Sequence, residues 1–185
     1  KQLGDCHFLP VQLPWGERAD FKGVIDLLSN KAYEGERSVE KDIPAEFAEE
    51  VELHRMQLIE AAAEGEDALL EKYLEGEQLT SEEILRGLKK VILSGAYVPV
   101  FVAAGSAEIG IAPILEAIIK LMPSPSEIPT VYAQGKDGEE PLTASDDGPL
   151  AAYVWKTTAD PFVGKITYFR VFSGMIASDT RVWNS

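Results

Sequence analysis

Cysteine and histidine are scarce in this 185-residue chain, which has one cysteine and two histidines. The single thiol, Cys6, cannot form a disulfide within the chain and fits a reducing compartment, so we expect a cytoplasmic protein. One thiol and two imidazoles are too few for a zinc site built only from cysteine and histidine. The motif Gly-x-Ser-x-Gly is absent, so the strand-to-helix turn of a serine hydrolase is not predicted.

Long apolar runs are missing as well. No stretch of about 18 apolar residues occurs, so no membrane-spanning helix is predicted. The first five residues lack the pattern of a signal peptide, and without an initiator methionine we expect the chain to be a piece of a longer protein. Hydrophobic residues make up 45% of the chain, which is typical of a globular protein with one or two domains.

Basic residues are few, and the resulting negative charge is concentrated in one segment. Residues 34–83 contain 17 acidic and 4 basic side chains, a net charge of −13, whereas the whole chain carries −14. One interpretation is a solvated face of helices. The other is a surface that attracts a basic partner and repels phosphate backbones.

Strands and then helices are predicted over the first half of the chain. Residues 6–14 form a short strand, and residues 21–33 form a hairpin that turns near Ser29-Asn30. A helix then runs from Pro44, a residue favoured in a first turn, to Gly65.

Two further helices are predicted before residue 96. Asp67 caps a short helix that stops at Gly76. Thr80-Ser-Glu-Glu83 has the sequence of a capping box, in which the Thr80 hydroxyl accepts from the third helical amide and Glu83 reaches back to the cap. This third helix ends at Gly95.

The apolar run from Tyr97 to Ala104 predicts a strand buried on both faces. The segment from Gly105 to Gly110 turns the chain into a helix, and we expect one set of its residues to point inward: Ile111, Ile114, Leu115, Ile118 and Met122. Prolines end this helix, so residues 123–147 are predicted to be a linker with a turn near Lys136.

Two alternating strands surround the turn Asp160-Pro-Phe-Val-Gly164, within the segment Gly148 to Gly174. They are predicted to open a β-barrel that the chain does not complete. We therefore expect this segment to be poorly ordered or to pair with a second copy, because its strand edges have no partners.

Two short motifs fail as nucleotide sites. Gly105 and Gly110 have the spacing of a phosphate loop, but Ile111 and Ala112 follow where lysine and serine or threonine are needed. Asn30-Lys-Ala-Tyr33 lacks the aspartate that ends a guanine-reading motif. Gly105 and Gly110 are also adequately explained as turn residues between a strand and a helix.

The segment Gly148 to Gly174 resembles the start of the second domain of elongation factor G, a family of translational GTPases. The matching positions are Gly148-Pro-Leu-Ala-Ala, Lys156, Asp160-Pro161, Gly164-Lys-Ile-Thr, Arg170-Val171 and Ser173-Gly174. Further matches are Val11-Gln-Leu-Pro14, Phe21-Lys-Gly-Val-Ile-Asp26, Lys72-Tyr-Leu-Glu-Gly-Glu77, Val98-Pro-Val-Phe101 and Leu121-Met-Pro-Ser-Pro125. The short Gly-Ser-Ala-Glu-Ile-Gly loop is similar to that of divergent elongation factor G-like paralogues.

The resemblance implies an α/β fold, the end of a P-loop GTPase domain with a helical α+β insertion, followed by the first strands of an all-β translation-factor barrel. It divides the chain into five parts. These are a GTPase-domain strand and connection (1–20), an acidic helical insertion (21–96), a return to the GTPase domain (97–122), a Pro-rich linker (123–147) and the incomplete start of domain II (148–185).

The resemblance also implies that the parent protein binds GTP or GDP with Mg²⁺ and hydrolyses GTP on the ribosome. Gly105, Ser106 and Ala107 correspond to the loop whose backbone amide contacts guanine. No phosphate-binding or catalytic group is present, so the fragment alone is not expected to bind or hydrolyse GTP.

Partners follow from the same resemblance. The acidic helix corresponds to the docking site of the large-subunit stalk protein, with Glu46, Glu49, Glu50 and Glu60 as the contacting residues. Basic residues of domain II correspond to neighbours of ribosomal RNA: Lys156, Lys165 and Arg170. The alternative is an acidic protein-interaction module without any nucleotide function.

Overall fold

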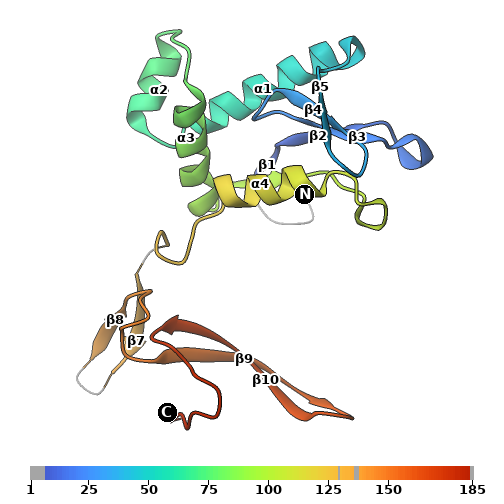
Figure 1. Cartoon of the computed structure of the whole chain (residues 1–185). Coiled ribbons are helices and arrows are strands. Elements are labelled where there is room, and N and C mark those ends of the chain that lie inside the picture. The colour runs from blue at the N-terminus through green and yellow to red at the C-terminus, as the bar shows by residue number, and fades with distance from the viewer. Residues whose placement is uncertain (1–6, 129, 136–137, 184–185) are drawn as a thin grey trace. The chain divides into compact units, whose positions relative to one another are not determined.

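The computed structural model describes residues 7–128, 130–135 and 138–183 (Figure 1). The chain divides into two compact units, Lys1–Met122 and Pro123–Ser185, which are described separately. The start of the first predicted strand, at Cys6, and most of the predicted turn near Lys136 lie outside the described residues. Among the described residues, no helix has both the length and the apolar character needed to cross a membrane.

Two small sheets form the β part of the first unit. Strands β1 (His7–Pro10) and β6 (Tyr97–Val100) pair in parallel. Strands β2 (Gln12–Trp15), β3 (Gly23–Asp26), β4 (Lys31–Glu34) and β5 (Val39–Lys41) form an antiparallel sheet in that order. The β3–β4 pair confirms the predicted hairpin. The predicted domain boundary between residues 20 and 21 separates β2 from β3, although these two strands pair in one sheet.

Val11 separates two strands where the sequence predicted one. Its N–H donates to the carbonyl of Val100 (2.9 Å), and its carbonyl accepts from the N–H of Leu27 (3.0 Å). The chain therefore leaves the β1–β6 sheet and enters the four-stranded sheet at this residue. The prediction of a single strand over residues 6–14 is wrong, because the two halves pair with different partners.

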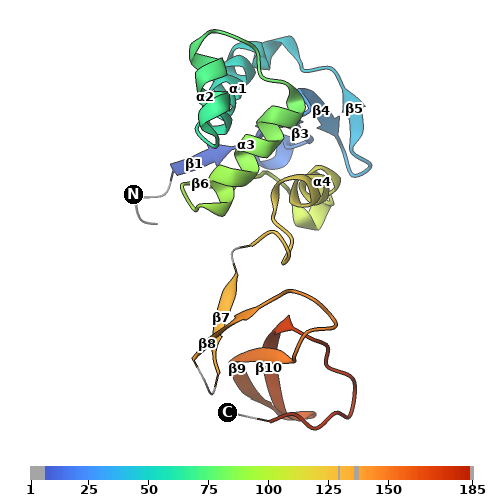
Figure 2. The same ribbon diagram turned by 90° about the vertical axis from the view of Figure 1, so that its left-hand side faces the viewer.

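Helices α1 (Ala48–Ala63), α2 (Asp67–Leu74) and α3 (Ser81–Leu93) follow β5, and α1 packs against α3 (Figures 1 and 2). The capping box is confirmed: the Glu83 N–H donates to Thr80 Oγ1 (3.3 Å), and the Thr80 N–H donates to Glu83 Oε2 (2.7 Å). The prediction for α2 is wrong by one residue. Glu66 is its N-cap, and Asp67 is already helical.

The core of the first unit lies between these helices and the strands. Its fully buried large apolar side chains come from the strands, the link between β1 and β2, the β3–β4 turn and the helices: Val11, Val24, Ile25, Leu27, Leu58, Leu88 and Leu121. Strand β6 contributes less than predicted, because Val98 and Val100 are exposed on one face. The prediction of a strand buried on both faces is wrong, because the face of β6 that carries Val98 and Val100 is exposed.

Helix α4 (Ile111–Leu121) buries a different face from the predicted one. Pro113, Ala117 and Leu121, spaced by four residues, are its buried side chains. Of the five residues predicted to point inward, Ile111, Leu115 and Ile118 are exposed, whereas Ile114 and Met122 are half-buried and Met122 packs against the core. The helix is apolar around most of its circumference, so periodicity could not select the face that packs.

The second unit consists of two antiparallel hairpins. Strands β7 (Val131–Gln134) and β8 (Glu139–Leu142) pair within the segment predicted to be a linker, so an uninterrupted linker is wrong for these residues. Strands β9 (Ala151–Asp160) and β10 (Gly164–Ser173) form the predicted pair. Asp160 closes their turn, because its carboxylate accepts from the N–H groups of Phe162 (2.8 Å) and Val163 (2.9 Å).

Candidate nucleotide-contact loop and acidic surface

The candidate nucleotide-contact loop, residues 102–110, follows strand β6 at its carboxyl end and leads into α4. Ligands of α/β proteins bind at this end of the strands. Gly105–Ala107 forms a single 3₁₀ turn. Below it, Ala104 and Ile109 exchange two backbone hydrogen bonds of 3.0 and 3.2 Å, which close the loop. Glu108 (φ 55°) and Gly110 (φ 80°) reverse the chain with left-handed conformations.

The tip of the loop presents unused hydrogen-bond donors. Within the described part of the chain, the N–H groups of Gly105 and Ser106 and the Ser106 hydroxyl have no hydrogen-bond partner, and both residues are exposed. The N–H of Ala107 instead donates to the carbonyl of Ala104 (3.1 Å). The structure therefore brings the three predicted residues together, with the free amides at Gly105 and Ser106. Such amides can donate to a carbonyl oxygen of a ligand.

Gln12 lies beneath the loop and was missed by the sequence analysis. Its side chain is buried, and its Oε1 accepts from the N–H of Val102 (3.2 Å). The available signal was a glutamine inside the apolar strand Val11-Gln-Leu13, because a buried amide requires hydrogen-bond partners. The sequence could not indicate that one partner lies 90 positions away.

The described residues lack the groups that bind phosphate and Mg²⁺, namely a lysine directly after the loop and a cluster of carboxylates. No cluster of three or more side chains of the metal-binding types His, Cys, Asp and Glu occurs there. The loop has no lysine after Gly110 to pair with a phosphate. The described residues of the loop thus offer backbone hydrogen-bond donors and no cluster of metal-binding side chains.

The acidic surface is the second candidate. Glu46 lies in the 3₁₀ turn Ala45–Phe47, Glu49 and Glu50 lie in the first turn of α1, and Glu60 lies near its end. All four side chains are exposed, and none forms an ion pair with another described residue. The three near the start of α1 also favour the helix, because its N-terminus is the positive end of its dipole.

Two exposed apolar residues on α1 extend this acidic surface. Glu49, Leu53, Met56 and Glu60 recur at i, i+4, i+7 and i+11, which places them on one side of the helix. Leu53 and Met56 are both 54% exposed. The sequence analysis selected the charges and missed the apolar pair between them, although the same spacing would have revealed it.

Other acidic residues of the insertion are neutralised within the protein. Glu83 pairs with Lys72 (2.9 Å), and Glu66 pairs with both Arg86 and Lys90 (2.9 Å each). The N–H of Thr80 and then Lys72 lower the pKa of Glu83 to about 2. Hydrogen bonds from Lys90 and Arg86 lower the pKa of Glu66. These two carboxylates are thus neutralised within the insertion, whereas those of Glu46, Glu49, Glu50 and Glu60 are not.

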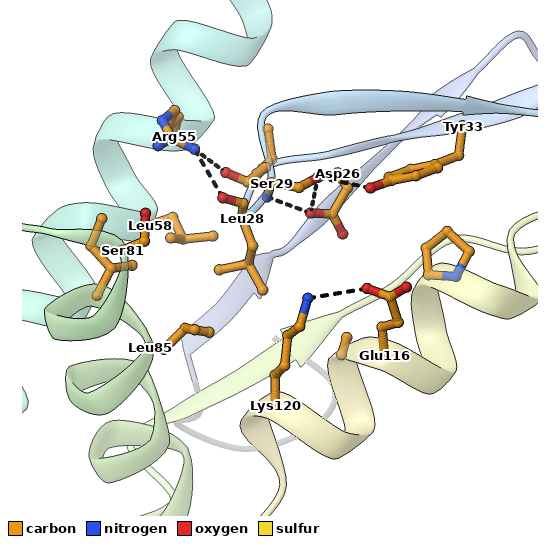
Figure 3. Close-up of a pocket in the computed structure, with 14 residues that line it drawn as sticks. Asp26, Leu28, Ser29, Tyr33, Arg55, Leu58, Ser81, Leu85, Glu116 and Lys120 are labelled. Carbon is orange, nitrogen blue, oxygen red and sulfur yellow. Dashed lines mark hydrogen bonds and ion pairs between the residues drawn. The ribbon is translucent and has the colours of Figure 1, made fainter. Parts of the chain in front are cut away.

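A cavity of about 250 Å³ lies between the β3–β4 turn and helices α1, α3 and α4 (Figure 3). Its polar groups are largely paired with one another. Asp26 accepts from Ser29, Lys120 pairs with Glu116 (3.1 Å), and Arg55 donates to the carbonyls of the β3–β4 turn. The remaining walls are apolar, so the cavity has few free groups with which to recognise a ligand.

The basic residues of the second unit do not form one patch. Lys156 lies opposite Tyr168 in the β9–β10 pair, and its ammonium group is 5.9 Å from the centre of that ring. Arg170 follows Tyr168 by two residues and shares its face, whereas Lys165 points to the other face. Two of the three predicted cations are thus brought to one side of the hairpin.

Comparisons with known proteins were made for the whole chain. No sequence model of a known protein family matches the chain. Elongation factor G of Thermotoga maritima is 42% identical over 184 residues, covering 96% of this chain and 27% of that protein. The elongation factors G of Thermotoga sp. RQ2 and Thermotoga petrophila are also 42% identical over 96% of the chain.

A crystal structure of a protein from Thermus thermophilus has the same fold over most of this chain. Its TM-score is 0.70 at 36% sequence identity, covering 94% of this chain and 24% of the other. The chain thus spans about a quarter of the length of the relatives that it matches. On the strength of this identity over nearly its whole length, the chain belongs to the elongation factor G family.

Proposed function

We propose that this chain is part of a longer, cytoplasmic translational GTPase and supplies the loop that contacts the guanine base. The observation that carries the proposal is the 42% identity to elongation factor G across 96% of the chain. The exposed, unpaired amides of Gly105 and Ser106 support it, because they offer donors to a base carbonyl at the carboxyl end of a strand.

The chemical basis of the contact is discrimination between bases. Guanine carries a carbonyl oxygen at the position where adenine carries an amino group, so an amide donor favours guanine and leaves adenine unpaired. A missing or mismatched hydrogen bond of this kind costs about 1–3 kcal/mol. The phosphates, Mg²⁺ and the attacking water would be held by residues outside this chain, and the chain alone would neither bind nor hydrolyse GTP.

Calorimetric titration tests this proposal. The full-length protein, with Mg²⁺, should bind GDP and GTP and should bind ADP far more weakly. The 185-residue chain under the same conditions should give no binding heat with either nucleotide. A full-length protein without any preference for guanine would contradict the proposal.

We further propose that the acidic surface of α1 docks a basic partner, the stalk protein of the large ribosomal subunit. Glu46, Glu49, Glu50 and Glu60 are exposed and free of ion pairs within the described chain, and Leu53 and Met56 add apolar contact area. Charge complementarity of this kind mainly accelerates encounter, and salt weakens it.

Charge reversal tests the docking proposal. Replacing both Glu49 and Glu50 with Lys should lower the affinity for the stalk-protein domain at least tenfold at low salt, mainly through the association rate. The matched control is Glu82→Lys, which reverses an exposed charge on α3 and should change affinity little. Equal binding by the double variant and the control would argue against this surface.

The second candidate function is an acidic interaction module that binds no nucleotide, favoured by the exposed, unpaired carboxylates at α1. The two experiments separate the alternatives. Stalk-domain binding combined with no guanine preference in the full-length protein would favour the module.

Contact with ribosomal RNA through the β9–β10 hairpin is a third part of the proposal. Lys156 and Arg170 share one face of the hairpin and are the candidates for phosphate neighbours. Replacing both with Glu should lower the affinity of the full-length protein for the ribosome and should make that affinity less dependent on salt. Lys165→Glu, which places the changed charge on the opposite face, is the control.

A further inference from the structure

Gln12 joins two segments that lie far apart in the sequence. Its Nε2 donates to Asp26 Oδ2 (3.2 Å) at the end of β3, and its Oε1 accepts from the N–H of Val102 (3.2 Å) before the Gly-Ser-Ala turn. Gln12 is 1% exposed, so neither bond has water as a ready substitute.

The chemistry of Asp26 fixes the orientation of this amide. The carboxylate oxygen of Asp26 accepts from the NH₂ group of Gln12, and the N–H of Val102 can only donate, so the oxygen of Gln12 must face Val102. Asp26 is itself held in place, because its other oxygen accepts from the N–H (2.8 Å) and the hydroxyl (2.9 Å) of Ser29. The acceptor presented to Val102 is consequently fixed by the β3–β4 turn.

Val102 is held on its other side by Gly110. A side chain added at Gly110 would lie 2.8 Å from the carbonyl oxygen of Val102 and 3.0 Å from a methyl group of Val24, so the two ends of the loop are in close contact. Ala104 and Ile109 then close the loop above this point. The location of the free amides at the tip therefore depends on the location of Val102.

We infer that Gln12 is a positioning residue for the nucleotide-contact loop: by holding the Val102 N–H, it sets the place from which Gly105 and Ser106 donate to the base. This inference rests on the proposed guanine contact. Gln12 lies below the loop and acts without touching the nucleotide. Its loss should therefore weaken guanine binding and leave the weak adenine binding unchanged.

The first experiment uses the 185-residue chain without nucleotide. In Gln12→Leu, amide hydrogen exchange at Val102, Ala104 and Ile109 should accelerate at least tenfold beyond the change explained by global stability. Gly87→Ala, a destabilising change between helices α1 and α3, is the matched control and should give only the global effect. Unchanged loop exchange in Gln12→Leu would overturn the inference.

A polarity swap provides the rescue. Gln12→Glu retains an acceptor for Val102 but faces the carboxylate of Asp26, so it should disturb the loop. When Asp26→Asn is added, the NH₂ group of the new amide donates to the carboxylate at position 12, and its oxygen accepts from Ser29. The double variant should therefore recover slow exchange at Val102. Failure of the double variant to improve on Gln12→Glu would count against the hydrogen-bonded relay.

The second experiment measures GDP and ADP affinities of the full-length protein. Gln12→Leu should lower the ratio of GDP to ADP affinity about tenfold, which is the usual effect of one misplaced hydrogen bond. The double variant Gln12→Glu with Asp26→Asn should have a ratio close to that of the wild type. A ratio within twofold of the wild type would overturn the positioning role. If the wild type lacked guanine preference, the proposed function would fail, and loop exchange alone would decide whether Gln12 holds the loop.

Discussion

Glu83 makes two kinds of contact at the start of α3. Its carboxylate accepts from the N–H of Thr80 (2.7 Å) and binds the ammonium group of Lys72 on α2 (2.9 Å). The first contact completes the capping box, and the second connects α2 to α3. The same two contacts lower the pKa of Glu83 from 4.5 to about 2, because both favour the charged carboxylate.

The lowered pKa predicts a specific dependence of stability on pH. A carboxylate whose pKa is lower in the folded state stabilises the fold above its unfolded pKa, and this contribution is lost as the pH falls from 4.5 to about 2. Glu83→Gln should be less stable than the wild type at pH 7, and the difference should shrink across this window. Thermal unfolding followed by circular dichroism from pH 2 to 7 measures it.

Glu82→Gln is the control for this prediction. Glu82 is exposed, lies next to Glu83 on the same helix and has no ion-pair partner among the described residues. Its replacement should leave the pH dependence close to that of the wild type. A difference for Glu83→Gln that stayed constant from pH 7 to pH 2 would show that the charge of Glu83 does not stabilise the fold.

Single residues differ in how far the sequence predicts their roles. The capping box was predictable, because Thr80 and Glu83 are three positions apart and their contacts are local. The role of Gln12 was not, since its partner Val102 is reached only after the fold brings β2 beside the nucleotide-contact loop. The free amides of Gly105 and Ser106 likewise depend on the backbone angles of the turn.

Between elements, helices α1 and α3 pack with their backbones in close contact. A side chain added at Gly87 would lie 2.0 Å from the carbonyl oxygen of Ala62, and one added at Gly65 would lie 2.4 Å from the carbonyl oxygen of Gly87. The backbone of α3 therefore rests directly on the last turn of α1. Glycine is needed at position 87 although it is a poor helix former.

Gly87→Ala tests this contact. Alanine gains up to about 1 kcal/mol in helix propensity but must push the two helices apart, which costs more in a closely packed interface. We expect a net loss of about 1–3 kcal/mol in the free energy of unfolding, measured by urea denaturation. Glu82→Ala, on the exposed side of α3, should change stability by less than about 0.5 kcal/mol. A stabilised Gly87→Ala variant would contradict the observed packing.

Helix α4 shows where sequence patterns stop being sufficient for an element. Its existence and its start after Gly110 were predictable from the turn and the apolar periodicity. Its buried face was not, because large apolar residues occur on both sides, and the fold selects Pro113, Ala117 and Leu121. The smaller side chains at 113 and 117 permit a close approach that hydrophobicity alone does not reveal.

For the whole molecule, the order of elements was predictable and several pairings were not. Helix caps, glycine stops and alternating strands are local signals, so the sequence of strands, helices and hairpins was largely correct. Strand pairing is determined by segments distant in sequence, as in the parallel contact of β1 with β6. For the same reason, the division of residues 6–14 into two strands required the structure.

The β9–β10 hairpin leaves an apolar face exposed, which predicts self-association of the chain. Phe169 lies opposite Val154, and Val171 lies opposite Ala152, so these side chains share one face of the pair. Phe169 is 46% exposed, and both hairpin edges are unpaired within the described residues. A second copy can cover the face and pair with an edge, which removes apolar area and strand groups from water.

Analytical ultracentrifugation of the chain should therefore show a dimer that forms with increasing concentration. Val171→Lys should shift the chain toward the monomer, because a charge at this position cannot be buried against a second apolar face without a partner. The control, Glu77→Lys, adds positive charge at an exposed residue that follows α2 and should leave the dimer intact. Full hydrogen-exchange protection of β9 and β10 in a proven monomer would contradict the prediction, since the hairpin would then need no covering partner.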